Sequence, residues 1–242
     1  MSRENTLFGI AMQSRFGVLF VTLVLVMFVP FLMPGILGKF LVPLLFTFVM
    51  LAALATVADT RRQFVIGLAL AIPAFSLTWL DKLAGGTLAA WHYAFSLLFL
   101  LYLAGAILTY VLYAHEVDAS TIFAAVSVYF LLAYIWATGY ALLELANPGS
   151  ITITALGTET SFDRIQNSGY LTYFSFVTLT TLGYGDVTPA SDGARVLAVT
   201  EAALGQLFLV VLVARLVGLH TSLDYATHQA AKAKRLEESG SS

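Results

Sequence analysis

The residues with the clearest chemical potential form one short segment, Thr181-Leu-Gly-Tyr-Gly185. A cation that has lost its water needs oxygen ligands, and successive backbone carbonyls supply them when they all point toward one axis. Glycines at alternate positions permit the backbone angles that this arrangement requires. One segment forms only one edge of each ion cage, so four copies are expected around the axis. The predicted ligand residues are Thr181, whose hydroxyl adds a ligand, Leu182, Gly183 and Tyr184.

A short helix is expected immediately before this segment, at about 171–179. Its C-terminal end carries partial negative charge, which favours a cation on the axis. The uncharged run 165–185 could pass for a membrane span by hydropathy, but it is rich in Thr and Ser and ends in Gly-Tyr-Gly. Irregular backbone survives at membrane depth only where protein or a wet cavity surrounds it. We therefore predict a re-entrant loop and not a simple span.

The composition requires a membrane around this loop. The chain has 242 residues, of which 59% are hydrophobic and 11% charged, and its mean hydropathy is +0.87. Soluble domains are about one quarter charged, so soluble packing is excluded, as is intrinsic disorder. A net charge of −2 gives no basic field for a nucleic acid, and the absence of cysteine removes disulfides and thiolate chemistry.

Cutting the chain at its charges predicts six transmembrane helices. Five lie in the uncharged runs 16–38, 40–58, 63–80, 83–115 and 119–143. The sixth apolar run, 196–219, contains Glu201 and Arg215. The predicted fold class is an all-α membrane protein with six transmembrane helices, a re-entrant pore helix and a selectivity filter, assembled as a tetramer. The predicted domains are a four-helix domain at 1–115, a pore domain at 116–219 and a short cytoplasmic tail at 220–242.

The hexapeptide Thr-Leu-Gly-Tyr-Gly-Asp186 resembles the signature filter of the tetrameric potassium channels. The run Glu201-Ala-Ala-Leu-Gly-Gln-Leu-Phe resembles the inner helix of the bacterial-type two-helix pore domain. The resemblance covers about 121–219 and implies a homotetramer in a lipid bilayer that conducts K⁺ passively. It departs at Leu182, where Val or Ile is common. Permeant K⁺ is the only bound species expected, and no other cofactor is.

The resemblance also implies roles for residues outside the ion path. It puts a hinge at Gly205, for which close helix packing is the alternative, and assigns Leu209, Val213 and Val217 to the gate. An aromatic donor on the pore helix, by spacing Tyr173, is expected to hydrogen-bond Asp186 and brace the filter. Because a carboxylate facing lipid is costly, Glu201 is expected to face protein or water. We favour hydrogen bonds from the Thr-rich pore helix behind the filter, and a position near the permeation path as a cation attractor is the alternative. The predicted filter-support residues are Tyr173, Thr180, Gly185, Asp186 and Glu201.

The first four spans resemble a voltage sensor in number only. The fourth, at about 88–113, contains no Arg and no Lys, so the charges that would move in the membrane field are missing. We predict no gating by an arginine-bearing helix. His92 is expected to be an interfacial polar residue rather than a pH sensor, Arg215 to snorkel to headgroups, and Asp118 or Ser120 to cap the fifth helix.

The distribution of Lys and Arg favours a cell-membrane protein with both termini in the cytoplasm. The basic residues on that predicted side are Arg3, Arg15, Arg61, Arg62, Lys232, Lys234 and Arg235. Those on the other side are Lys39, Lys82, Arg164 and Arg195.

Other functions are less consistent with these patterns. An ion-uptake transporter subunit would be expected to carry four filter-like loops in one chain, and only one is found. A less selective cation channel, or a non-conducting subunit of a channel complex, stays open. No metalloprotease or serine-hydrolase motif is found, so we do not expect an enzyme.

Overall fold

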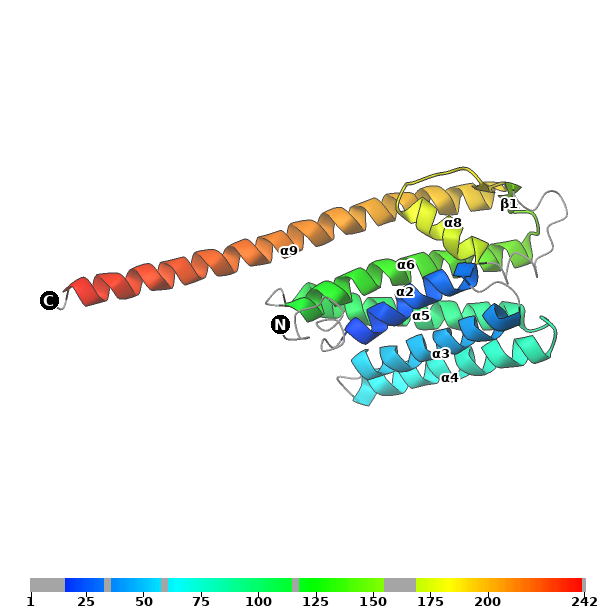
Figure 1. Cartoon of the computed structure of the whole chain (residues 1–242), viewed down its shortest axis with the longest axis horizontal. Coiled ribbons are helices and arrows are strands. Elements are labelled where there is room, and N and C mark those ends of the chain that lie inside the picture. Colours follow the sequence, from blue (N-terminus) through cyan, green and yellow to red (C-terminus); the bar gives the residue numbers. More distant parts are fainter. Residues whose placement is uncertain (1–15, 33–35, 58–60, 115–117, 155–168, 241–242) are drawn as a thin grey trace.

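The computed structural model describes residues 16–32, 36–57, 61–114, 118–154 and 169–240, which are almost entirely helical (Figure 1). The helices are α2 (Gly17–Leu32), α3 (Ile36–Val57), α4 (Arg61–Leu83), α5 (Ala89–Tyr113), α6 (Ala119–Ala146), α8 (Tyr170–Leu179) and α9 (Asp192–Gly240). Two short strands, β1 (Ile151–Ile153) and β2 (Val187–Pro189), pair antiparallel.

Four of the described helices are long and apolar enough to cross a membrane. They are α4, α5, α6 and the Asp192–Arg215 part of α9. Helices α2 and α3 contribute the shorter apolar stretches Gly17–Val29 and Leu41–Leu54. The structure therefore supports a membrane protein with four candidate spans, and the count of six stays a prediction.

The helices form a bundle against which the short helix α8 packs at one end (Figure 1). Helix α5 packs against α4 and α6, α2 packs against α3 and α6, and α8 contacts both α6 and α9. The strands and the α4–α5 turn lie at this same end, which we call the filter end. Helix α9 leaves the bundle in the opposite direction and extends well beyond it.

Two apolar clusters hold these elements together. The larger joins α2, α3, α4, α5 and α6 to the α8 residues Phe176 and Leu179. The smaller, which we call the filter-end cluster, joins the end of α6 to α8, both strands and the start of α9. Its buried members are Tyr140, Ala141, Ile151, Ile153, Leu171, Phe174, Val187 and Ala194. The filter-end cluster thus contains residues that come both before and after 181–185 in the chain.

The cap of α6 is as expected. The Oδ1 atom of Asp118 accepts hydrogen bonds from the Thr121 amide at 2.8 Å and the Thr121 hydroxyl at 2.7 Å. These bonds satisfy donors that the first helical turn leaves free, and they lower the pKa of Asp118 below its ordinary value.

Several boundaries differ from the sequence prediction. Arg61 and Arg62, expected in a loop, are the first residues of α4 and are exposed. Helix α9 continues without interruption through 219–220 to Gly240, so the predicted tail begins inside a helix. The two strands add a small β element to a fold predicted as all-α. Residues 155–168, between β1 and α8, lie outside the described residues.

Candidate ion-conduction site

The segment 181–185 begins as a continuation of the α8 C-terminus. The Thr181 amide donates to the Thr178 carbonyl at 2.9 Å, and the Leu182 amide donates to the Val177 carbonyl at 2.8 Å. These bonds satisfy carbonyls that the end of a helix leaves without partners. The direction of α8 therefore sets where the segment starts. The predicted helix at 171–179 agrees with the observed Tyr170–Leu179.

The backbone φ angle alternates along this segment between the left-handed region and other regions. Thr181, Gly183 and Gly185 have φ angles of 58°, 60° and 82°, whereas the intervening Leu182 and Tyr184 are not in the left-handed region. Thr181 is the one non-glycine among the described residues with a positive φ, an uncommon conformation for a β-branched side chain. Such alternation turns successive carbonyl groups to one side of a strand. Strain of this kind gathers at functional sites.

The far end of the segment is braced at Asp186. The Tyr173 hydroxyl donates to Asp186 Oδ2 at 2.8 Å, so the predicted hydrogen bond is present. The Thr154 amide donates to the Asp186 carbonyl at 2.9 Å, next to the pairing of β1 with β2. Asp186 thus joins helix α8 to the strands. Its predicted role in filter stability stays a prediction.

Glu201 lies behind α8 and is fully buried. Its Oε2 atom accepts a hydrogen bond from the Tyr140 hydroxyl at 2.6 Å, and its Oε1 atom contacts the Ser175 hydroxyl. Three helices, α6, α8 and α9, therefore meet at one carboxyl group. The expected pore-helix donor is Ser175, and Tyr140 is a second partner that sequence reasoning missed.

The number of hydrogens that this network can donate constrains the protonation state of Glu201. The Ser175 hydroxyl lies within hydrogen-bond distance of both Glu201 and the Ala133 carbonyl, which is 2.7 Å away. A serine hydroxyl has one hydrogen to donate, so it must accept at one of these contacts. A carbonyl cannot donate, but a carboxyl group that carries a proton can. The network is complete when Glu201 donates to Ser175 and Ser175 donates to Ala133.

A second buried carboxyl group, Glu144, organises the other side of the filter end. It is 3% exposed, and its oxygens accept from the Gly149 amide at 2.6 Å and the Ile151 amide at 2.9 Å. It therefore ties the last turn of α6 to the loop that leads into β1. In the sequence Glu144 only marked the end of an apolar run.

Gly205 is a site of very close packing. A Cβ atom at this position would lie 2.5 Å from the Leu179 carbonyl oxygen and 2.8 Å from Leu179 Cδ1. Helix α9 runs straight through Gly205 without a break. The absence of a side chain therefore lets α9 contact the end of α8, which favours the packing alternative. The predicted hinge role stays a prediction.

The remaining predicted residues lie around these contacts. The Thr180 hydroxyl donates to the Phe176 carbonyl at 2.6 Å, and Gln206 Nε2 donates to the Thr181 hydroxyl at 3.4 Å. Gln206 was not predicted. The proposed gate residues follow on α9, with Leu209 partly buried and Val213 and Val217 exposed.

Arg215 has hydrogen-bond partners that the sequence analysis did not predict. Its guanidinium donates to the Val111 carbonyl at 3.2 Å, to the Leu112 carbonyl, and to the Ala114 carbonyl at 3.3 Å. These carbonyls form the C-terminal end of α5, where a cation is favourable. Arg215 therefore joins α9 to the C-terminal end of α5. The expected snorkelling to headgroups stays a prediction.

Comparison with known proteins agrees with the site. Residues 149–221 match the family described as Ion channel, which is a family of channels and not of enzymes. A 90-residue stretch is 37% identical to the two pore potassium channel c of Oryza sativa subsp. japonica. That stretch is 36% of this chain and 17% of the rice protein, so the chain spans a small part of this relative. No solved structure matches the chain. The family match includes α8, the segment 181–185 and Glu201, and begins after α6.

Proposed function

We propose that this chain, with an ion channel domain at residues 149–221, is one subunit of a potassium-selective channel. The observation that carries the proposal is the alternating backbone at Thr181, Gly183 and Gly185, placed directly at the end of α8. A single-file row of carbonyl oxygens can replace the hydration shell of K⁺. The name of the similar rice protein, a potassium channel, supports this choice of ion.

The proposed ligands are the backbone carbonyls of Thr181, Leu182, Gly183 and Tyr184, with the Thr181 hydroxyl at the inner end. Because these are backbone atoms, Leu182 changes only the packing behind the filter. Potassium selectivity is therefore expected to survive this departure from the common sequence.

The proposed assembly is a homotetramer. Each chain supplies one filter segment, and a cage of carbonyls needs several around one axis. Within one chain the side chains of Leu182 and Tyr184 are 54% and 67% exposed, so the packing that would hold a filter strand in place is incomplete. Helix α9 also exposes apolar residues, among them Val199, Leu207 and Val210. Neighbouring copies would cover both surfaces.

The proposed topology places six helices in the cell membrane with both termini in the cytoplasm, from the distribution of Lys and Arg. Helix α5 contains no Arg and no Lys, so gating by movement of an arginine-bearing helix is not expected. A steep voltage dependence with several gating charges would contradict this part of the proposal.

The decisive test is potassium flux through the purified chain in liposomes, with a matched pair of glycine variants. Gly183→Ala places a methyl group on a left-handed residue of the filter, whereas Gly85→Ala does the same in the exposed α4–α5 turn, where φ is 65°. Both substitutions carry similar backbone strain. We expect Gly183→Ala to abolish flux and Gly85→Ala to retain it.

Reversal potentials and subunit counting decide among the alternatives. A reversal potential that follows the K⁺ gradient and ignores Na⁺ supports selectivity. A value near zero in opposing K⁺ and Na⁺ indicates a less selective cation channel. No flux from a folded assembly indicates a non-conducting subunit. Native mass spectrometry is expected to find four chains, and a monomer would contradict the proposed pore.

A further inference from the structure

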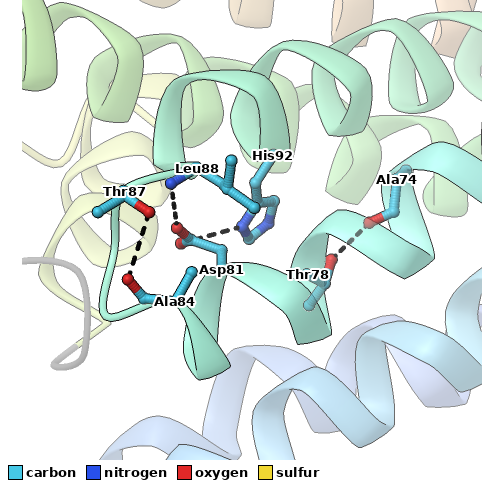
Figure 2. A network of polar contacts seen from close by, with 7 residues as sticks. All are labelled: Ala74, Thr78, Asp81, Ala84, Thr87, Leu88 and His92. Carbon is cyan, nitrogen blue, oxygen red and sulfur yellow. Dashed lines mark hydrogen bonds and ion pairs between the residues drawn. The ribbon is translucent and has the colours of Figure 1, made fainter.

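A buried acid and a partly buried imidazole face each other at the α4–α5 turn (Figure 2). Asp81, in the last turns of α4, is 3% exposed. Its Oδ1 atom accepts a hydrogen bond from the Leu88 amide at 2.9 Å, which holds the turn closed at the start of α5. Its Oδ2 atom lies 3.9 Å from His92 Nδ1, one turn into α5. This distance is too long for a hydrogen bond.

The His92 ring is left without a partner at this nitrogen. Nδ1 is buried and has no hydrogen-bond partner among the described residues. The Thr78 hydroxyl cannot donate to this nitrogen, because its one hydrogen is donated to the Ala74 carbonyl at 2.7 Å (Figure 2). Ser96, one turn beyond His92 on the same face of α5, also has a buried, unpartnered hydroxyl. Buried polar atoms are normally satisfied, so this face of α5 is an incomplete network.

We propose that the Asp81–His92 pair is a proton-binding site that modulates the channel from the filter end of the four-helix domain. A proton from the aqueous phase adds to the neutral imidazole, and no bond is broken. The resulting imidazolium has an N–H donor on both nitrogens. An N–H beside an ionised carboxylate forms a charge-assisted bond of about 2.8 Å, so the ring closes the present gap.

The groups around His92 allow this change. Burial of the ring opposes a charge on it, and on α4 Asp81 favours the charged ring whereas the adjacent Lys82 opposes it. On α6, the Tyr140 hydroxyl is held by Glu201, and the Glu144 carboxylate is held by two backbone amides. The described side chains of α3 include no titratable group. Asp81 is therefore the counter-ion for a charge on His92.

A stacked tyrosine connects this pair to the pore domain. The His92 and Tyr93 rings stack with centroids 4.8 Å apart and an interplanar angle of 14°. Tyr93 packs in turn against the filter-end cluster, which includes Phe174 of α8 and Val187 of β2. A ring drawn toward Asp81 changes its contact with Tyr93. The movement thus reaches the elements that flank the filter.

The first arm of the test measures proton binding itself and does not depend on conduction. The chain has four histidines, and the side-chain ¹⁵N signal that His92→Gln removes identifies His92 in the purified full chain. We expect this signal to titrate between about pH 5 and about pH 8, the range in which imidazole changes charge. In Asp81→Asn the amide oxygen can still accept from Leu88, but the midpoint is expected at lower pH. A ring that does not titrate, or an unchanged midpoint in Asp81→Asn, would overturn the proposal.

The second arm rests on the proposed channel function and measures flux against pH at the filter end. We expect wild-type flux to change by on the order of threefold or more between about pH 5.5 and about pH 7.5. His92→Gln is expected to abolish this change, and His228→Gln, a matched loss of a histidine on α9, to keep it. A pH response that survives in His92→Gln, or that is absent from the wild type, would overturn the modulation. If wild-type flux is absent at every pH, the proposed function fails, and the titration arm still decides on the proton site.

Discussion

The two halves of the molecule each bury a carboxyl group between helices, and they complete its hydrogen bonding differently. In the pore half, Glu201 meets hydroxyls from α6 and α8, and a consistent set of donors and acceptors can be written for the network. In the four-helix half, Asp81 holds one backbone amide and faces an imidazole at 3.9 Å. A completed buried network makes one arrangement far more stable than any other. An incomplete one has a second arrangement available at modest cost.

This difference agrees with the proposed roles of the two halves. A filter has to hold its carbonyls in fixed positions, so the elements behind it benefit from a network with a single solution. The four-helix domain has no charge stripe on α5. Any influence of this domain on the pore must therefore come from other groups, and the Asp81–His92 pair and Arg215 are such groups.

The largest effect is expected from truncating Glu201, and truncating Asp81 provides the comparison. Glu201→Ala leaves the Tyr140 and Ser175 hydroxyls buried without their partner and opens a cavity, which we expect to cost about 3 kcal/mol or more. Asp81→Ala loses mainly one backbone contact, and we expect about 1–2 kcal/mol. Thermal unfolding of the assembled protein in detergent measures both.

The matched amide variant sharpens this comparison. Glu201→Gln keeps an oxygen for Tyr140 and provides an N–H for Ser175, so it is expected to cost less than about 1 kcal/mol if Glu201 carries a proton. A cost for Glu201→Gln equal to that of Glu201→Ala would show that Glu201 does not carry the proton that this network requires.

A comparably large effect is expected at the contact between α8 and α9. Gly205→Ala forces a methyl group to within 2.5 Å of the Leu179 carbonyl oxygen, which is backbone and cannot move aside cheaply. We expect a loss of about 2–3 kcal/mol and weaker assembly, seen as a lower melting temperature. Gly139→Ala, where no atom lies near the added methyl group, is the control. If Gly205→Ala were fully stable and changed only opening, Gly205 would act as a hinge and not as a packing contact.

A smaller effect is expected where the two halves are joined at the other end. Arg215→Gln removes the cation from the C-terminal carbonyls of α5 and should cost about 1–2 kcal/mol. If the contact couples the four-helix domain to the gate, the same substitution also reduces the pH response that His92 provides. Arg195→Gln, which breaks only an exposed pair with Asp192, should change neither property. An unchanged pH response in Arg215→Gln would show that the Arg215 contact does not transmit the effect of His92 to the gate.

The smallest effect on stability is expected at the filter exit. Tyr173→Phe keeps the ring and removes the hydrogen bond to Asp186, which lies near solvent. We expect about 0.5–1 kcal/mol per chain and a change in slow inactivation, with potassium selectivity retained. Currents recorded during long openings measure this change. Unaltered inactivation and heat resistance would show that Tyr173 merely packs.

The sequence by itself determined the parts of the site that depend on neighbours along the chain. The short helix before Thr181, the alternating backbone around Gly183 and Gly185, and the cap at Asp118 all arise from local spacing, turn geometry and side-chain size. The Tyr173–Asp186 bond was also predictable, because the known filter arrangement sets the thirteen-residue separation that brings these side chains together. The apolar runs likewise predicted the four long helices, since hydropathy is a property of the segment itself.

Only the tertiary structure decided which distant groups meet. The partners of Glu201, the pairing of β1 with β2 and the capping of α5 by Arg215 join residues 26 to 104 positions apart. Such contacts follow from how helices pack, and many packings satisfy the same apolar pattern. His92 shows the consequence most clearly, because its sequence position suggested an interface whereas the packing of α4 on α5 buries its Nδ1 atom near Asp81. Whether a polar residue near the end of a span meets water or a buried acid depends on its neighbours in space.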